Sequence, residues 1–322
     1  MWRRCRPSST DSHAIARLAA RQTLNGPTIM NQSTGKRAIG FIGLGIMGFS
    51  MASRLAAAGY PLHVYNRTRA KAEPLIEAGA TWQATPRALA EVSDVVFTIV
   101  GTPADVRTLY LGDDGLIAHA RRDAVLVDMT TSSPKLAEEL AAHAAERGVH
   151  MLDAPVSGGD IGAREGRLSI MVGGASAVLA RVEPMLRCLG TNIVLQGGPG
   201  AGQHTKLCNQ IVIASTMMGV CEGLAYAHSA GLDADTVLSA IGGGAAGGFQ
   251  LNNLGPRIAK GDFAPGFFIE HFIKDMRIAH EEARSMGREL PGLELVRVMY
   301  QELAERGCAR NGTQALSKLY ER

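Results

Sequence analysis

The chain has 322 residues, of which 46% are hydrophobic and 20% charged, so it is not a disordered chain and has room for two domains. Its net charge is +3, but residues 1–29 contribute +4 through five arginines against Asp11, which leaves −1 for the rest. A nearly neutral body argues against a nucleic-acid-binding surface. The five cysteines are scattered without C-x-x-C spacing, so we expect neither a disulfide scaffold nor a metal site.

Residues 1–36 lack the hydrophobic periodicity of the chain that follows. They are rich in arginine and polar residues and contain no apolar core of a secretory signal. We therefore expect a disordered or leader extension, with Met30 as an alternative start, on a cytoplasmic protein. Organelle targeting by residues 1–29 is the alternative, because arginine-rich segments with few acidic residues are typical of transit peptides.

Two short apolar runs flank a Gly-x-Gly-x-x-Gly sequence and a helical pattern. In chain order these segments are 38–42, 43–48, 49–59 and 61–65. In a strand–turn–helix–strand unit, Gly43 permits the tight turn, Gly45 lets the backbone approach a pyrophosphate, and Gly48 lets the helix pack closely on the strand. The first helical residues, Ile46 and Met47, belong to a helix N-terminus that supplies N–H donors to phosphates. The unit predicts dinucleotide binding.

The end of the second strand bears on the choice of coenzyme. An NAD site usually carries Asp or Glu about 20 residues after the glycines, where it binds the ribose hydroxyls. This chain has Asn66, Arg67 and Thr68 there, without a carboxylate that would repel a 2′-phosphate. Arg67 can pair with that phosphate, and its two neighbours can donate hydrogen bonds. We predict NADP(H), with NAD(H) as the alternative if Arg67 is only a solvated loop charge.

Further strands continue the alternation. We expect them at 94–100, 124–128, 150–153, 168–173 and 192–195. Ligands of open α/β sheets bind beyond the C-terminal strand ends, which makes Val100 and Thr130 candidates for coenzyme contacts and Thr131 a candidate for substrate. The Thr/Ser cluster also fits an ordinary helix N-cap, and both interpretations can hold together.

A second candidate loop follows the strand at 150–153. Ser157 stands beside Gly158 and Gly159, and a glycine pair after a strand exposes backbone N–H groups. Together with the serine hydroxyl, these groups form a small cradle for an anion. A substrate carboxylate is the occupant we expect.

A long helix is predicted from Gln203 to about Ala230, and its apolar character suggests burial between domains or subunits. Lys206 lies in its first turn, with Asn209 and Gln210 on the same face. Burial and the helix dipole would lower the pKa of Lys206 toward neutrality, so that it could act as general acid or base. An amide beside it would hold the same substrate oxygen or orient the lysine. A snorkelling surface lysine is the alternative.

The remaining sequence has helical composition. We expect helices at 234–241, 249–260 and 267–286, and no apolar run long enough to cross a membrane. The glycine-rich stretch 242–248 fits a loop, with a mobile wall of the active site as the alternative. Lys274 with Asp275 fits a solvated pair, and the alternative is that the two residues reach the site. The sequence thus predicts an α/β fold, with a Rossmann-type dinucleotide-binding domain at 37–198 and an all-α substrate and dimerisation domain at 199–322.

Four motifs resemble those of the β-hydroxyacid dehydrogenases, the 3-hydroxyisobutyrate dehydrogenase family, and the resemblance covers about residues 37–322. They are GFIGLGIMG at 40–48, DAPVSGG at 153–159, GAGQHTKLCN at 200–209 and the Lys-Asp pair at 274–275. The resemblance implies that Lys206 is the catalytic acid or base and that residues 157–159 hold a substrate carboxylate. It also implies that Thr130 contacts the coenzyme and that Lys274 lies near its nicotinamide end.

Some members of the family carry Asn where this chain has Gln210, so the choice between Asn209 and Gln210 as the helper amide stays open. Residues 66–68 resemble the NADPH-using branch. The implied reaction is hydride transfer between NADP(H) and a small β-hydroxy acid or its semialdehyde. The alternative is reduction of 2-hydroxy-3-oxopropionate (tartronate semialdehyde), glyoxylate or succinic semialdehyde. A homodimer or homotetramer is suggested.

Two other functions are weighed against this one. A non-catalytic nucleotide-binding scaffold would not need Lys206, which this chain retains. Reduction of imines is disfavoured for the same reason, because the relatives that reduce imines replace this lysine.

Overall fold

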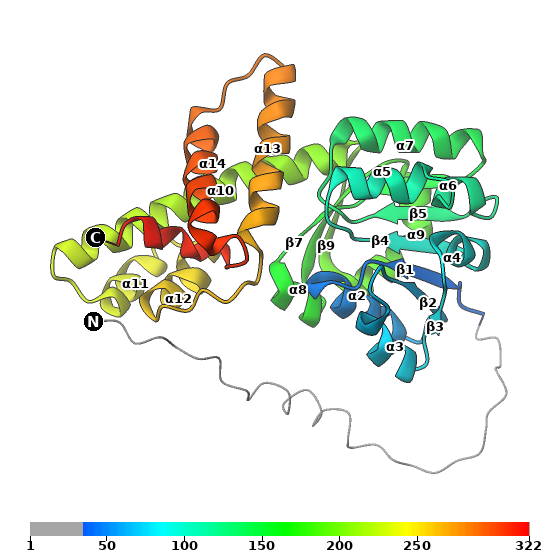
Figure 1. Ribbon diagram of the computed structural model, residues 1–322, viewed down its shortest axis with the longest axis horizontal. Helices are drawn as coiled ribbons and strands as arrows, with labels where there is room; N and C mark the ends of the chain where they lie inside the picture. Colours follow the sequence, from blue (N-terminus) through cyan, green and yellow to red (C-terminus); the bar gives the residue numbers. More distant parts are fainter. Residues whose placement is uncertain (1–34, 322) are drawn as a thin grey trace, which may run out of the picture. The chain divides into compact units, whose positions relative to one another are not determined.

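The computed structural model describes residues 35–321, and within it the chain from Arg37 onward forms one compact unit. The extension expected at 1–36 therefore lies outside the described residues, apart from its last two. Figure 1 shows a sheet flanked by helices, followed along the chain by an assembly of helices.

Nine strands form one sheet in the described part of the chain. They are β1 Ile39–Ile42, β2 Leu62–Tyr65, β3 Thr81–Trp82, β4 Val95–Thr98, β5 Val125–Asp128, β6 His150–Asp153, β7 Val156–Ser157, β8 Leu168–Gly173 and β9 Gly190–Gly197. The order is β3-β2-β1-β4-β5-β6-β8-β7, and β9 pairs with β8. All pairs from β3 to β6 are parallel, whereas β8 runs antiparallel to β6 and β7.

The parallel part of this sheet is the Rossmann arrangement, in which strand order reverses beside β1. The strands expected from sequence are present, two of them with the expected ends and the others with ends shifted by at most two residues. The two-residue strands β3 and β7 were not expected, because they are too short for an alternating pattern.

Helices cover both faces of the sheet (Figure 1). They are α2 Ile46–Ala57, α3 Glu73–Glu77, α4 Pro86–Val92, α5 Pro103–Leu111, α6 Leu116–His119, α7 Pro134–Glu146, α8 Gly159–Glu165 and α9 Ser176–Leu189. Successive strand residues point to opposite faces, so Val95 and Phe97 pack with α2 and α9 while Val96 packs with α4, α5 and α7. Both faces are apolar because both are covered.

The second part of the chain is helical. Its elements are α10 Ala201–Ser229, α11 Ala234–Gly242, α12 Gly255–Ala259, α13 Ile269–Ser285 and α14 Pro291–Leu303, with π-helical turns at Gln250–Leu254 and Ala304–Cys308 and a 3₁₀ segment at Thr313–Leu319. Phe272 and Tyr300 meet edge to face in its core, with ring centroids 5.2 Å apart. The glycine-rich stretch 242–248 is a turn-rich connection, as expected. It lines an apolar hollow with α10 and α11 that includes none of the predicted site residues.

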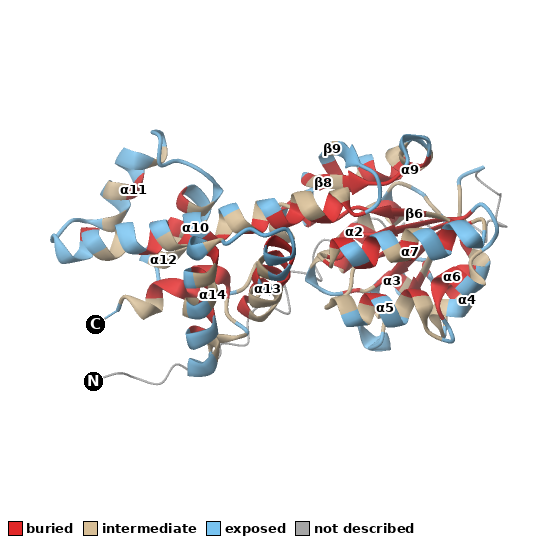
Figure 2. Ribbon diagram, turned by 90° about the horizontal axis from the view of Figure 1, so that it is seen from above, coloured by how far each residue is buried: buried red, intermediate tan, exposed pale blue. Residues whose placement is uncertain are grey.

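The helix α10 needs a correction to the sequence-based expectation about membranes. With 29 residues, it is long and apolar enough to cross a membrane by length and composition alone. The expectation of no apolar run of this length missed the helix because polar residues interrupt its apolar stretches. The helix contacts α13, α14 and β8, and its buried apolar residues between Leu207 and Cys221 belong to the helical core. Figure 2 shows buried residues along α10.

Candidate active site

The glycine loop after β1 has the geometry that its sequence predicts. Gly43 adopts φ +96°, which side chains rarely tolerate, and a Cβ there would lie 2.0 Å from the Ile99 carbonyl oxygen. A Cβ on Gly48 would lie 1.8 Å from the Gly43 carbonyl oxygen. A Cβ on Gly45, the N-cap of α2, would meet nothing within 4 Å. The space beside Gly45 at a helix N-terminus fits the pyrophosphate of a dinucleotide.

In the segment after β2, Asn66 and Arg67 lie in different environments. Asn66 is committed to the loop, because its Oδ1 accepts from the Leu44 N–H at 2.9 Å and its Nδ2 donates to the Thr68 carbonyl at 2.8 Å. The Arg67 side chain is 91% exposed and lies 3.9 Å from Asp105. Arg67 is therefore the group free to turn toward a phosphate, whereas the expected donation from the Asn66 amide competes with an existing bond.

The segment after β5 is tied to its neighbours. Thr130 is buried; its hydroxyl accepts from the Val100 N–H at 2.9 Å, and its own N–H donates to Asp128 at 3.1 Å. Burial raises the pKa of Asp128 to about 6. The Thr131 carbonyl accepts from Lys274 Nζ at 2.6 Å. The Thr130 side chain thus shapes the loop, and its backbone N–H is likewise bonded within the protein.

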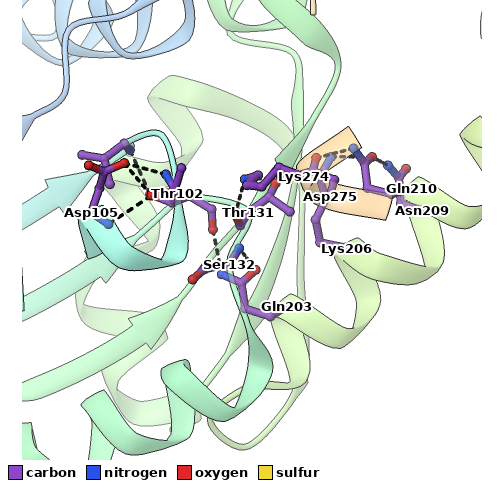
Figure 3. A network of polar contacts seen from close by, with 12 residues as sticks. Thr102, Asp105, Thr131, Ser132, Gln203, Lys206, Asn209, Gln210, Lys274 and Asp275 are labelled. Carbon is purple, nitrogen blue, oxygen red and sulfur yellow. Dashed lines mark hydrogen bonds and ion pairs between the residues drawn. The ribbon is translucent and has the colours of Figure 1, made fainter. Parts of the chain in front are cut away.

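Lys206 lies at the centre of a buried polar network (Figure 3). Its side chain is 7% exposed, and its Nζ donates to Gln210 Oε1 at 2.9 Å. The same oxygen accepts from Asn209 Nδ2 at 2.8 Å, and Gln210 Nε2 donates to Asp275 Oδ2 at 2.6 Å. The amide oxygen of Gln210 faces two N–H donors and its amide nitrogen faces a carboxylate, and these partners fix the orientation of the amide.

The charge of Lys206 depends on this environment. Burial lowers the pKa of Lys206 to about 8; the negative charge of Asp275 acts in the opposite direction, and the positive charge of Lys274 acts with burial. A lysine with this pKa can both donate and accept a proton near neutral pH.

The Lys274–Asp275 pair is buried, so the expectation of a solvated pair is wrong. Lys274 Nζ lies 2.9 Å from Asp275 Oδ1, and the two side chains are only 11% and 1% exposed. Both come from α13, which packs along α10. The sequence alone does not show that α13 packs along α10, so it gave no reason to expect burial of two adjacent charged residues.

The loop after β6 adjoins this network. Ser157 Oγ donates to Asn209 Oδ1 at 3.2 Å, so Asn209 connects the loop to Gln210. Gly158 and Gly159 have φ values of +130° and +64°, which suits a sharp turn that exposes backbone N–H groups. The structure therefore brings together the loop expected to hold a carboxylate and the lysine expected to move a proton.

Two buried side chains, Asp153 and Gln203, were not among the predicted site residues. Asp153 accepts from backbone N–H groups of the α10 start, and Gln203 bonds to the backbone of the segment after β5. Both belong to the quoted motifs, so the motifs located them without indicating their partners. Within residues 35–321, no group of three or more His, Cys, Asp or Glu side chains is placed to hold a metal ion.

Two family models match the chain. One describes the NAD binding domain of 6-phosphogluconate dehydrogenase and matches residues 38–198; the other, NAD-binding of NADP-dependent 3-hydroxyisobutyrate dehydrogenase, matches residues 200–320. Together they span the sheet-containing part and the helical part.

Curated and solved proteins agree with these models. "Probable 3-hydroxyisobutyrate dehydrogenase-like 1, mitochondrial" from Arabidopsis thaliana is 47% identical over 98% of this chain and 94% of its own length. The 2-hydroxy-3-oxopropionate reductase of Escherichia coli is 40% identical over 88% of this chain and 97% of its own. A structure of Mycobacterium tuberculosis 3-hydroxyisobutyrate dehydrogenase with L-serine superposes with a TM-score of 0.81 at 29% identity, covering 89% of this chain and 100% of that one.

Fold, site and relatives define a dehydrogenase that binds NAD(P) and acts on CH–OH groups. The chain belongs to the β-hydroxyacid dehydrogenase family, whose members include the 3-hydroxyisobutyrate dehydrogenases. The expectation of a Rossmann-type domain followed by a helical C-terminal domain is confirmed.

Proposed function

We propose that the protein transfers hydride between NADP(H) and a small β-hydroxy acid or its semialdehyde, with Lys206 as the proton donor or acceptor. The observation that carries the proposal is the buried Lys206, with a pKa near 8, linked through Gln210 and Asn209 to the Ser157 loop. The name of the Arabidopsis relative and the description of the second family model support the substrate class.

Each group has a defined role in this mechanism. The coenzyme, when bound, supplies or accepts the hydride. Ser157 with the backbone of Gly158 and Gly159 holds the substrate carboxylate, which orients the reacting carbon and makes the transfer effectively intramolecular. Lys206 donates a proton to the carbonyl oxygen during reduction and removes one from the hydroxyl during oxidation. Gln210 accepts from Lys206 and so orients its ammonium group.

Coenzyme contacts are assigned to the glycine loop and the neighbouring strand ends. The backbone of Gly45, Ile46 and Met47 would face the pyrophosphate, as the open space at Gly45 suggests. Val100 and Thr130 follow the ends of β4 and β5 and are joined by a hydrogen bond from the Val100 N–H to the Thr130 hydroxyl, and we place the ribose and the nicotinamide beside them. Thr131 is assigned to the substrate.

The substrate is tested with a panel of acids and semialdehydes followed by absorbance at 340 nm with each coenzyme. The panel contains 3-hydroxyisobutyrate, L-serine, 2-hydroxy-3-oxopropionate, glyoxylate and succinic semialdehyde. The second candidate is reduction of 2-hydroxy-3-oxopropionate, which the Escherichia coli relative favours. If the protein turned over none of these compounds, the proposal would be contradicted and a non-catalytic scaffold would be favoured.

Arg67 is the residue on which the NADP(H) preference depends. Arg67→Ala is expected to raise KM for NADPH by roughly 10-fold or more, since a charge-assisted bond contributes about 1.5–3 kcal/mol, and to leave KM for NADH unchanged. Kinetics with both coenzymes measure this. Arg87→Ala is the matched control, because Arg87 on α4 is an exposed arginine paired with Glu91. Equal use of the two coenzymes, unaltered by Arg67→Ala, would contradict the preference.

Asp275 is expected to set the pH dependence. Asp275→Asn keeps an oxygen for Gln210 Nε2 but removes the negative charge that raises the pKa of Lys206, so this pKa should fall below about 8. Oxidation requires neutral Lys206, and the rising limb of its pH–rate profile should therefore move to lower pH. Asp233→Asn, at the exposed N-cap of α11, should leave the profile in place. If the rising limb of the profile for Asp275→Asn lay at the same pH or at a higher pH, Asp275 would not be the group that raises the pKa of Lys206.

Assembly, boundary and location are also proposed. A homodimer or homotetramer is supported by exposed apolar residues on α10 and α14, such as Val212 and Val298, and light scattering tests it. The domain boundary at 198/199 is supported by the end of β9 at Gly197.

We propose a cytoplasmic protein that binds neither nucleic acid nor membrane. Imaging of the full chain in cells tests its location, and fractionation tests whether it associates with membranes. Organelle targeting is the alternative that the name of the Arabidopsis relative supports.

A further inference from the structure

The carboxylate of Asp153 holds the start of α10. Asp153 is the last residue of β6 and is 2% exposed. Its Oδ1 accepts from the Gly200 N–H and its Oδ2 from the Gln203 N–H, both at 2.8 Å. A buried carboxylate is unfavourable unless its oxygens are bonded, and a helix N-terminus has N–H groups without helical partners. Each therefore satisfies the other, and β6 and α10 are joined.

Gln203 makes the second connection, to the segment after β5 (Figure 3). Its side chain is fully buried; its Oε1 accepts from the Ser132 N–H at 2.8 Å and its Nε2 donates to the Thr130 carbonyl at 2.7 Å. These two backbone groups flank Thr131, whose carbonyl accepts from Lys274. The side-chain amide of Gln203 thus bonds to the backbone on both sides of Thr131, once as an acceptor and once as a donor.

The same turn is in close contact with the sheet. A Cβ on Gly202 would lie 2.4 Å from the Met171 carbonyl oxygen and 2.6 Å from the Asp153 carbonyl oxygen. The first turn of α10 therefore packs directly against strand ends. Lys206 lies three residues after Gln203 on the same helix, so a shift of this turn would shift Lys206 too.

We propose that Asp153 and Gln203 are positioning residues for hydride transfer. Together they join the segment after β5, the loop that follows β6 and the helix that carries Lys206, and so set the position of the lysine relative to coenzyme and substrate. This inference rests on the proposed role of Lys206 in proton transfer. Neither side chain bonds to Lys206 itself, so each acts through the backbone that it holds.

Turnover provides the first test. Asp153→Asn retains the shape of the side chain but turns an amide donor toward an N–H group, and Gln203→Met retains the length but loses both bonds. Each is expected to lower kcat at least 10-fold, since a misplacement of about 1 Å can cost 10²-fold. The dissociation constant of NADPH, measured by its fluorescence, should change by less than kcat, because the glycine loop and Arg67 are untouched and only the contacts near Thr130 are affected.

Gln314→Met is the matched control. Gln314 is equally buried and bonds to two backbone carbonyls, those of Asp262 and Ala264, within the helical part. We expect it to lower Tm about as much as Gln203→Met but to leave kcat within about 2-fold, since the bonds lost are comparable. A kcat in Gln203→Met no lower than in Gln314→Met would reduce Gln203 to a structural role.

A second readout does not depend on turnover. Labelling of Lys206 by an amine-selective acylating reagent as a function of pH, followed by peptide mass spectrometry, reports its pKa in the folded protein. Release of the turn should expose Lys206 and raise this pKa from about 8 toward that of free lysine in Asp153→Asn and Gln203→Met, with no change in Gln314→Met. Asp275 and Lys274, the charged groups that act on Lys206, stay in place in every variant.

The two readouts separate the inference from the proposed function. A raised pKa of Lys206 in a protein that turns over no hydroxy acid would support the positioning role and reject the proposed reaction. Normal turnover, with kcat and the Lys206 pKa unchanged in both variants, would overturn only the positioning role. If either substitution prevents folding, Gln203→Asn, which is too short to span both backbone groups, serves in its place under the same expectations.

Discussion

Lys206→Ala is expected to lower kcat by about 10²–10⁴-fold, the range that a positioned general acid or base contributes. The dissociation constant of NADPH should stay within about 3-fold of its original value, because we assign the coenzyme to the glycine loop, whereas Lys206 donates to Gln210. Single-turnover kinetics measure the first quantity and coenzyme fluorescence the second. The physical reason is that Lys206 is buried with a pKa of about 8, so it can exchange a proton where bulk water is excluded.

Two further variants sharpen this result. Lys206→Arg keeps a positive charge but cannot lose it near neutral pH, so it should be as inactive in oxidation as the alanine variant. Lys260→Ala removes an exposed lysine at the C-cap of α12 and should leave kcat unchanged. Retention of more than about a tenth of kcat by Lys206→Ala would rule out Lys206 as the general acid or base.

Two glycines of the same loop should respond differently to alanine. Gly45→Ala places a methyl group where the structure has open space, so Tm should hardly change, while the dissociation constant of NADPH should rise roughly 10-fold or more, about 1.4 kcal/mol. Gly48→Ala brings a Cβ to 1.8 Å from the Gly43 carbonyl oxygen. This variant should therefore weaken NADPH binding and, unlike Gly45→Ala, lower the free energy of unfolding by about 1–3 kcal/mol.

Thermal unfolding and coenzyme fluorescence on the two variants decide between these expectations. Gly219→Ala on α10 is the control for a helical glycine with open space around it, and it should affect neither quantity. If Gly45→Ala bound NADPH normally, the pyrophosphate would not lie against this part of the backbone.

Much of the fold and of the candidate site was predictable because the signals are local. A glycine sequence between a strand and a helix indicates a nucleotide loop without knowledge of any distant residue, since turn, helix start and strand are neighbours in the chain. Lys206 at the start of a long helix became a candidate from spacing together with the family resemblance, and the strand ends made Thr130 and Ser157 candidates. The lowered pKa of Lys206 followed from the expected burial.

The sequence by itself thus determined the order of strands and helices and the glycine loop, and it supplied the candidate for proton transfer, because periodicity and turn chemistry act over a few residues. Only the tertiary structure decided that Asp275 is buried, that Asn66 already has partners, and that Gln203 spans the segment after β5. Each depends on which segment covers the residue, and these contacts join positions 22 to 73 residues apart. A buried polar residue and a solvated one look alike in sequence until the partner that satisfies it is in place.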